Sequence, residues 1–423
     1  MDYVAVGSFL FNCFYMAAMG FVSSMLPLYA TELGADVTSI GPIWTIAYLS
    51  SFVMALFWGS LSDRSGKRMP HIIVGTTAMS IVCILYTFAE NIYSMSAVMI
   101  LGEVLGSSQA FPTFMTLVSE LARTEKRGRS MGVFWMGGSV GWAVSVSVAG
   151  FIAQQYGIRR GFYLSSILYL TSLFVARYFL GAHAKRAPLE KQVTFGDAIS
   201  GFKRFGSAFF VFWVATICFY IGDIVKVSFV LIFFERELGI NRALATLILS
   251  LGTWAEIPSL PLLGTLSDRI GRKPLLLLGL FTFSIFNALM SFSQNYIHAG
   301  LTMLLFGLIW GSFTSASSAL VGDMVEEQSR AKAMSLYNSA SSIASIVAPT
   351  VMSLAILQTS FRTAFIVIAA ILATGFLLIL LGVPPKATGD QGAGNRKPEQ
   401  PFNSTSNTFY RKDNDIESRG KPC

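Results

Sequence analysis

Long apolar stretches alternate with short polar breaks along most of the chain. A bilayer core about 30 Å thick is crossed by about 20 apolar helical residues, and windows of that size recur twelve times. The pattern therefore predicts an all-α integral membrane protein with 12 transmembrane helices. The predicted helices are Tyr3 to Ala30, Gly41 to Leu61, His71 to Ala89, Met95 to Ser119, Met131 to Ala153, Gly161 to Gly181, Ala208 to Phe234, Ala243 to Leu266, Pro274 to Ser293, Ala299 to Val321, Ala333 to Ile356 and Arg362 to Val383.

The longest internal polar break, residues 182–206, separates the first six windows from the last six. We expect residues 1–181 and 207–383 to form two six-helix bundles joined by this cytoplasmic linker. Residues 384–423 turn to Gly, Asn, Ser, Lys and Asp with few large apolar residues. That composition predicts a disordered cytoplasmic tail.

Composition and charge support the membrane assignment. Only 13% of the residues are charged and 53% are hydrophobic, which excludes soluble domains and disordered scaffolds. The formal charge of +8 is spread over short clusters between apolar runs, so it does not indicate a nucleic-acid partner. With a cytoplasmic N-terminus, the inside loops carry 17 Lys and Arg residues and the outside loops carry five. The positive-inside rule then predicts a multi-pass plasma-membrane protein with both termini cytoplasmic.

The sequence offers no candidate for catalysis or for a bound cofactor. Cys13, Cys83 and Cys218 lie inside apolar runs, and their spacing fits neither a disulfide framework nor a metal site. A nucleophile placed beside a base is also not visible. We therefore expect no enzymatic activity, no cofactor and no metal.

An internal repeat divides the chain into two related parts. Residues 59–68 read GSLSDRSGKR, and residues 264–273 read GTLSDRIGRK, 205 positions later. Glu120 and Arg127 are echoed, at the same spacing, by Asp323 and Arg330. The repeat predicts two homologous six-helix halves with the same orientation in the membrane, hence a pseudo-symmetric pair.

The repeated loops predict a polar gate at the cytoplasmic ends of the halves. Glycine permits close helix approach and tight turns, and an acidic side chain can face a helix N-terminus and pair with arginine. The alternative is that these charges only set the topology. The predicted gate consists of Gly59, Asp63, Arg64, Gly66, Lys67, Arg68, Glu120, Arg127, Gly264, Asp268, Arg269, Gly271, Arg272, Asp323 and Arg330.

The two loops resemble the signature of the major facilitator superfamily between helices 2 and 3 and between helices 8 and 9. The spaced acid and arginine pairs are similar to those after its helices 4 and 10. The resemblance covers about residues 1–383. It implies a secondary transporter whose halves rock about one central site surrounded by helices 1, 4, 7 and 10.

Four ionisable residues lie inside apolar windows, where charge is costly unless it faces a cavity or a partner. By the resemblance, Glu103, Asp223 and Lys226 converge on the central cavity and could bind a proton and cargo alternately. Asp223 and Lys226 lie three residues apart, so they could instead form a purely structural ion pair. Glu256 precedes two prolines, which are expected to bend its helix, and a flexed helix beside a buried acid would suit a moving part of the transporter. The alternative is that Glu256 only forms a hydrogen bond to a neighbouring helix and serves packing.

Polar and aromatic residues within the helices are weaker candidates, because each could make an ordinary interhelical contact. They are Asn12, Tyr15, Gln109, Trp135, Asn287, Trp310 and Asn338.

Short matches bear on the cargo. Gly137 and Gly141 resemble the helix 5 motif of proton-coupled exporters, but Trp142 stands where that motif has proline, and helix 1 lacks the acid often found there. A second resemblance, to bacterial sugar-efflux transporters, rests on residues 139–142, 256–258 and 336–338. It implies that Trp135 and Trp142 stack against a sugar, with Gln109 and Asn338 as hydrogen-bond partners.

We therefore expect proton-coupled efflux of a small drug-like or sugar-like molecule by a protein that functions as a monomer in the lipid bilayer. Proton-coupled uptake of a sugar or an organic acid is one alternative. A non-transporting receptor built on a transporter scaffold is the alternative from another class.

Overall fold

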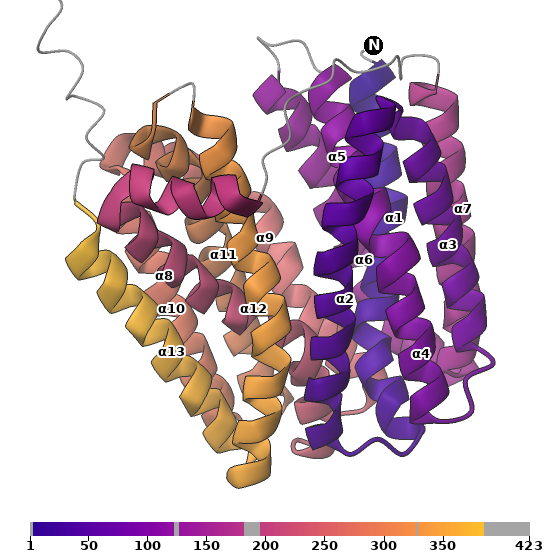
Figure 1. The fold of residues 1–423 in the computed structure, drawn as a ribbon. Helices are drawn as coiled ribbons and strands as arrows, with labels where there is room; N and C mark the ends of the chain where they lie inside the picture. The colour runs from indigo at the N-terminus through magenta and orange to yellow at the C-terminus, as the bar shows by residue number, and fades with distance from the viewer. Residues whose placement is uncertain (1–2, 122–126, 182–194, 327–328, 385–423) are drawn as a thin grey trace, which may run out of the picture. The chain divides into compact units, whose positions relative to one another are not determined.

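The computed structural model describes residues 3–121, 127–181, 195–326 and 329–384 (Figure 1). Every regular element in these ranges is a helix. The predicted tail from residue 385 and the part of the predicted linker at 182–194 lie outside the described residues.

The helices fall into two sets that follow one another along the chain. The first set is α1 (Tyr3–Glu32), α2 (Val37–Ser65), α3 (Arg68–Tyr86), α4 (Ile92–Gly102), the π-helix η1 (Glu103–Ser107), α5 (Ser108–Leu121), α6 (Arg127–Tyr156) and α7 (Ile158–Leu180). The second set is α8 (Phe195–Arg236), α9 (Arg242–Ile270), α10 (Arg272–Phe292), α11 (Tyr296–Met324), α12 (Arg330–Gln358) and α13 (Phe361–Gly382).

Eleven helices of the described chain are long and apolar enough to cross a membrane. The twelfth predicted crossing is the continuous run of α4, η1 and α5, in which the π-helical turn divides the α-helix into parts of 11 and 14 residues. The prediction of 12 crossings is confirmed. A π-helical turn inside an α-helix is rare and often marks a functional site.

The second half begins with a broken helix. The helix α8 starts at Phe195, inside the range predicted as a linker, and its backbone is non-helical at Gly206, where φ is 82°. Glycine adopts this left-handed conformation without a steric penalty. Gly206 thus separates a short helical segment from the membrane-crossing part of α8.

Helix packing within the halves follows the sequence repeat. In the first half α1 packs on α6 and α7, and α3 packs on α5 and α7. In the second half α8 packs on α12 and α13, and α10 packs on α11 and α13. The same scheme in both halves confirms two pseudo-symmetric bundles.

The two halves meet mainly where α6 packs on α9 and where α2 packs on α12. The polar contacts lie toward the end where α2 and α9 begin, which we call the far end. There the Gly41 amide donates to Ser353 Oγ at 2.9 Å, and the Gly150 amide donates to Thr246 Oγ1 at 3.0 Å. The opposite end carries both repeated loops, and we call it the paired-loop end.

Glycines distinguish the two ends of the interface. A Cβ atom on Gly41 would lie 2.4 Å from Ser353 Oγ, and one on Gly150 would lie 2.1 Å from the backbone oxygen of Arg242. At the paired-loop end, no described atom lies within 4 Å of a Cβ built on Gly59 or Gly132. The halves are therefore in backbone contact at the far end, and the close approach expected at Gly59 is absent in this conformation.

The far-end turn between α1 and α2 is fixed by an N-cap. Asp36 accepts a hydrogen bond from the Val37 amide at 2.8 Å and another from the Thr38 hydroxyl. The bond from Thr38, together with the backbone amides, holds the pKa of Asp36 below its usual value. The start of α2, which packs against the other half, is thereby well defined.

Candidate functional site

A cavity of about 180 Å³ lies between the two halves. It is lined by α1 and α6 of the first half and by α8, α9 and α11 of the second. Its charged residues are Asp223, Lys226 and Glu256, and its aromatic residues are Trp135, Trp142, Phe306 and Trp310. We call it the central cavity.

Lys226 is held on two sides. Its Nζ atom lies 3.1 Å from Asp223 Oδ1, one helical turn away on α8, and 3.2 Å from the ring centroid of Phe306. The ring face adds a cation–π attraction to the ion pair. Both charged side chains nevertheless line the central cavity, so the pair is also available to a bound molecule.

Glu256 of α9 lines the same cavity as this pair. Its Oε1 atom accepts a hydrogen bond from Ser139 of the first half at 3.1 Å, and only 8% of the residue is exposed. The next turn of α9 contains two prolines, and there the Ser259 hydroxyl donates to the Glu256 backbone oxygen and to that of Gly307. The serine thus ties the proline-containing turn to α11, while Glu256 links the two halves.

Glu103 does not line the central cavity. It lies in a second cavity of about 80 Å³, lined mainly by the first half, where it faces the hydroxyls of Ser51 and Ser107. The expected convergence of Glu103 with Asp223 and Lys226 is therefore absent from this structure. Glu103 is instead held within the first half, where Ser51 of α2 and Ser107 of its own π-helical turn are its hydrogen-bond partners.

The weaker candidates divide by side-chain type. The predicted tryptophans Trp135, Trp142 and Trp310 all line the central cavity, and Tyr15 lines the second one. Among the described residues, no group of three or more His, Cys, Asp or Glu side chains could hold a metal ion.

The amide side chains lie elsewhere. Asn12 donates to the Phe134 oxygen at 2.8 Å and so braces α1 against α6, while Asn287 donates to the Phe283 oxygen of its own helix. Gln109 is buried and bonds the Leu105 oxygen of its own helix. Asn338 is exposed and lines neither cavity. The hydrogen-bond partners expected for a sugar are therefore not in the central cavity.

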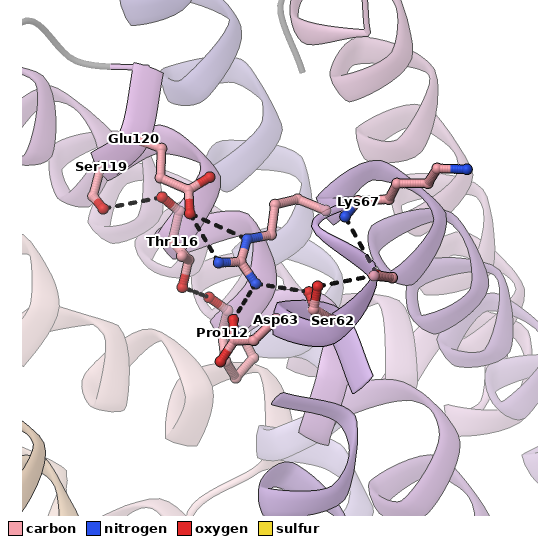
Figure 2. A network of polar contacts seen from close by, with 9 residues as sticks. Ser62, Asp63, Lys67, Pro112, Thr116, Ser119 and Glu120 are labelled. Atoms are coloured by element: carbon pink, nitrogen blue, oxygen red, sulfur yellow. Dashed lines mark hydrogen bonds and ion pairs between the residues drawn. The ribbon is translucent and has the colours of Figure 1, made fainter. Parts of the chain in front are cut away.

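At the paired-loop end of the first half, the side chains of Ser62, Asp63 and Glu120 lie close together (Figure 2), and all three contact Arg68. Its guanidinium contacts Asp63, donates to Ser62 Oγ at 3.0 Å and lies 2.9 Å from Glu120 Oε1. Arg68 is the first residue of α3, whereas Asp63 and Glu120 lie in the last turns of α2 and α5. The cluster thus ties three helix ends together within one half.

The second half repeats this cluster with Arg272. Its guanidinium donates to Asp268 at 2.5 Å and to Ser267 Oγ at 3.0 Å, and lies 3.5 Å from Asp323 Oδ2. The acidic residues of the repeat thus pair with an arginine in both halves, although Arg68 and Arg272 do not occupy aligned positions of the repeat. Each cluster lies within its own half, however, so the expected clasp between the halves is not formed in this conformation.

The remaining predicted gate residues contribute less. Arg64, Lys67 and Arg269 are exposed, and Arg330 donates to the Gly322 oxygen at 3.3 Å. Gly66 ends α2 with φ of 62°, and Gly271 separates α9 from α10 with φ of 94°. Gly264 has only a distant neighbour, Ser315, at 3.9 Å from a built Cβ. The side chain of Arg127 lies outside the described part of the chain.

An ion-pair cluster at the far end was not predicted. Arg242 donates to Glu32 of the first half at 2.7 Å and to Glu235 of its own half at 2.7 Å. Two hydroxyls continue the contact, because Ser147 Oγ lies 2.9 Å from Ser250 Oγ. In the sequence Arg242 is only one of five Lys and Arg residues in the predicted outside loops, and no repeat marks it.

Comparison with known proteins identifies the relatives of this arrangement. The model of the family described as Major Facilitator Superfamily matches residues 8–224 and again residues 208–414. The protein named Multidrug resistance protein MdtG from Escherichia coli O17:K52:H18 (strain UMN026 / ExPEC) is 25% identical over 371 residues, which are 85% of this chain and 90% of that protein. The MdtG protein of strain K12 / DH10B matches equally well.

Solved structures share the fold at low sequence identity. The nucleoside transporter NupG has a TM-score of 0.71 at 15% identity, over 89% of this chain and 97% of NupG. A POT family transporter in complex with 5-aminolevulinic acid has a TM-score of 0.72 at 13% identity, over 89% of this chain and 94% of that one. A bacterial homolog of the human lysosomal transporter Spinster, inward-facing and unoccupied, has a TM-score of 0.71 at 13% identity, over 91% and 98% of the chains.

Proposed function

Because this chain belongs to the major facilitator superfamily, we propose that it is a secondary transporter that exports a small organic molecule in exchange for protons. The observation that carries the proposal is the central cavity, which both halves line and which holds three ionisable side chains within the membrane-embedded core. Buried charges of this kind are costly and are retained where a substrate or a proton binds.

The cargo class follows from the charges and rings of the central cavity. Two carboxylates, Asp223 and Glu256, face one ammonium group, Lys226, so the ionised site has a net negative charge. Three tryptophans and Phe306 present apolar ring faces beside it. An aromatic or otherwise lipophilic cation fits this chemistry better than a sugar, because rings can stack with it and attract its charge.

Proton exchange is assigned to Glu256. Lys226 already neutralises Asp223 at 3.1 Å, whereas the direct partner of the Glu256 side chain among the described residues is the Ser139 hydroxyl. A proton on Glu256 removes its charge and lowers the affinity for a cation, and loss of that proton restores it. Proton and cargo thus compete for one carboxylate, which couples their movements in opposite directions.

Efflux rather than uptake is supported by the relatives, which are named multidrug resistance proteins. The paired-loop end is assigned to the cytoplasm, because its loops carry most of the Lys and Arg residues. In that orientation, the plasma-membrane protein has both termini in the cytoplasm and is in an inward-open conformation. One chain carries both halves of the cavity, so a monomer suffices for transport.

The transition to the outward-open conformation requires two linked movements. The far-end contacts of Gly41, Gly150 and Arg242 separate, and the paired-loop ends approach each other where Gly59 and Gly132 now face free space. The Arg68 and Arg272 clusters keep the helix ends of each half together during this rocking. The gate thus acts through the stiffness of each half as well as through contacts between them.

The test is transport by the purified protein in proteoliposomes under an imposed pH gradient. An aromatic cation, a neutral hexose and an organic acid are supplied in parallel. We expect the cation alone to move against the proton gradient, and we expect Glu256→Gln to abolish the dependence on the gradient. Glu90→Gln, an exposed acid at the far end, is the matched control and should transport normally.

Movement of the hexose alone, or uptake of the organic acid along with protons, would replace the cargo or the direction proposed above. Reconstituted protein that moves none of the three classes would favour the non-transporting receptor.

A further inference from the structure

The second cavity contains a carboxylate without a visible counter-charge. Glu103 lines this cavity of about 80 Å³ and faces two serine hydroxyls. None of the ion pairs between described side chains includes Glu103. A carboxylate at membrane depth without a positive partner is strongly unfavourable. A cation bound in the cavity would stabilise the charged form of Glu103, which its described neighbours, two hydroxyls, do not neutralise.

A second observation at the same cavity also indicates a missing ligand. Tyr169 lines the cavity with no exposed surface, and its hydroxyl has no hydrogen-bond partner. A buried unpaired hydroxyl costs about 1–3 kcal/mol. The hydroxyl and the carboxylate belong to different helices, α7 and η1, and both residues line the same cavity.

The walls define the chemistry of that ligand. Five aromatic residues line this cavity together with Glu103, namely Tyr15, Trp44, Tyr48, Tyr86 and Tyr169. Aromatic rings around an anionic group are typical of sites for alkylammonium ions, because each ring face attracts a soft, weakly hydrated cation. Hard metal cations instead require several oxygen ligands, and here a single carboxylate is accompanied only by hydroxyls.

The size and position of the cavity limit the ligand further. An apolar cavity of about 150 Å³ takes up benzene, so the smaller volume here suits only a compact head group. Val227 of α8 lines both this cavity and the central one, but the charged residues of the central cavity do not line the second. We propose that the second cavity is a binding site for a small organic monocation, whose ammonium group lies between Glu103 and the hydroxyl of Tyr169.

Thermal unfolding of the full-length protein in detergent tests this site without any transport assay. Trimethylammonium chloride is titrated against KCl at constant ionic strength. We expect a saturable rise in melting temperature of about 2–4 °C for the wild type, with no rise when NaCl replaces the trimethylammonium salt. Because transport is not measured, the result is independent of the proposed export function.

Three variants locate the effect. Glu103→Gln should lose the response, and Tyr169→Phe should retain a weaker one with a several-fold higher midpoint. Glu256→Gln, which alters the central cavity, should respond as the wild type does. If Glu103→Gln fails to fold, equilibrium dialysis of radiolabelled trimethylammonium against the wild type and Tyr169→Phe gives the same comparison.

An unchanged response in Glu103→Gln, a response lost in Glu256→Gln, or equal binding by wild type and Tyr169→Phe would each overturn the proposal. A wild type that ignores trimethylammonium, or that responds equally to sodium, would also overturn it.

Discussion

The two ends of the helix bundles use polar residues in different ways. At the far end, polar contacts join one half to the other, as between Thr45 and Thr350 at 2.8 Å, and between Arg242 and Glu32. At the paired-loop end, the arginine clusters at Arg68 and Arg272 join helices of the same half. The difference shows that one end forms the interface between the halves, while the other stiffens each half.

Small residues account for the far-end interface. Glycine and hydroxyl residues let helix backbones approach closely, and interhelical hydrogen bonds in membranes contribute about 0.6–2 kcal/mol each. Several such bonds hold the halves together without making the contact permanent. A closed end built in this way can separate and re-form during a transport cycle, as the proposed mechanism requires.

The largest effect is expected for Gly150→Ala. The added Cβ would lie 2.1 Å from the Arg242 backbone oxygen, and backbone cannot move aside as a side chain can. Overpacking of this kind costs about 1–3 kcal/mol, which shifts the equilibrium about 5- to 150-fold away from the closed far end. Alkylation of a single cysteine at the far-end interface by an impermeant maleimide should speed up accordingly.

The matched control for this variant is Gly132→Ala, in the same helix but facing free space. Equal alkylation rates in the two variants would mean that close backbone packing does not hold the far end closed.

Gly59→Leu tests the opposite end. No described atom lies near this glycine, so the folded protein should lose less than about 0.5 kcal/mol of stability. If the paired-loop ends must meet during the cycle, the new leucine side chain blocks their approach. An overpacking cost above about 1.4 kcal/mol lowers the population of the conformation with this end closed at least about tenfold. Transport should fall by the same factor. Melting temperature and transport are measured on the same preparation, and normal transport would contradict closure at this position.

Asp63→Ala and Asp268→Ala compare the two arginine clusters. The first cluster is more enclosed, since 10% of the Arg68 side chain is exposed against 25% for Arg272. Solvent screening weakens exposed pairs, so Asp63→Ala should cost about 1 kcal/mol and Asp268→Ala less than about 0.5 kcal/mol. Thermal unfolding of both variants gives the difference, and a larger loss for Asp268→Ala would contradict it.

The smallest effect is expected for the pair of Arg242 and Glu32. A double-mutant cycle with Arg242→Gln and Glu32→Gln isolates their interaction. The Glu32 side chain is 43% exposed, so the coupling energy should be only about 0.5 kcal/mol and should shrink as salt is raised. For each variant in the cycle, the fraction of molecules with the far end closed is measured. A coupling energy that does not change with salt would show that solvent does not screen the pair.

Much of the fold was predictable because the repeat and the apolar windows are long signals. The ion-pair partners of the predicted gate residues were harder to predict. Lys67 and Arg272 align in the repeated loops, yet Arg68 is the residue that binds Asp63. The reason is that α3 begins one residue later than α10 relative to the loop glycine, so the first residue of each helix supplies the guanidinium. Turn geometry of this kind is not visible in the aligned sequences.

The central site shows a similar limit. The three-residue spacing of Asp223 and Lys226 correctly predicted their ion pair, because residues three apart lie on the same face of a helix. Spacing along the sequence could not place Glu256 in the cavity and Glu103 outside it, since both placements depend on which helices pack around each cavity. Both are properties of the packed helices and leave no periodic pattern in the sequence.

The most direct test of alternating access measures both ends in one sample series. Spin labels replace the exposed residues Arg64 and Arg269 at the paired-loop end, and Glu90 and Gln294 at the far end, in a cysteine-replaced background. Distances between the two spin labels at each end, measured by electron–electron double resonance, are compared in proteins with and without Gly150→Ala. We expect the Gly150→Ala change to shorten the paired-loop distance and lengthen the far-end distance. Distances that change in the same direction, or a far end that opens while the paired-loop end stays unchanged, would contradict the rocking of two rigid halves.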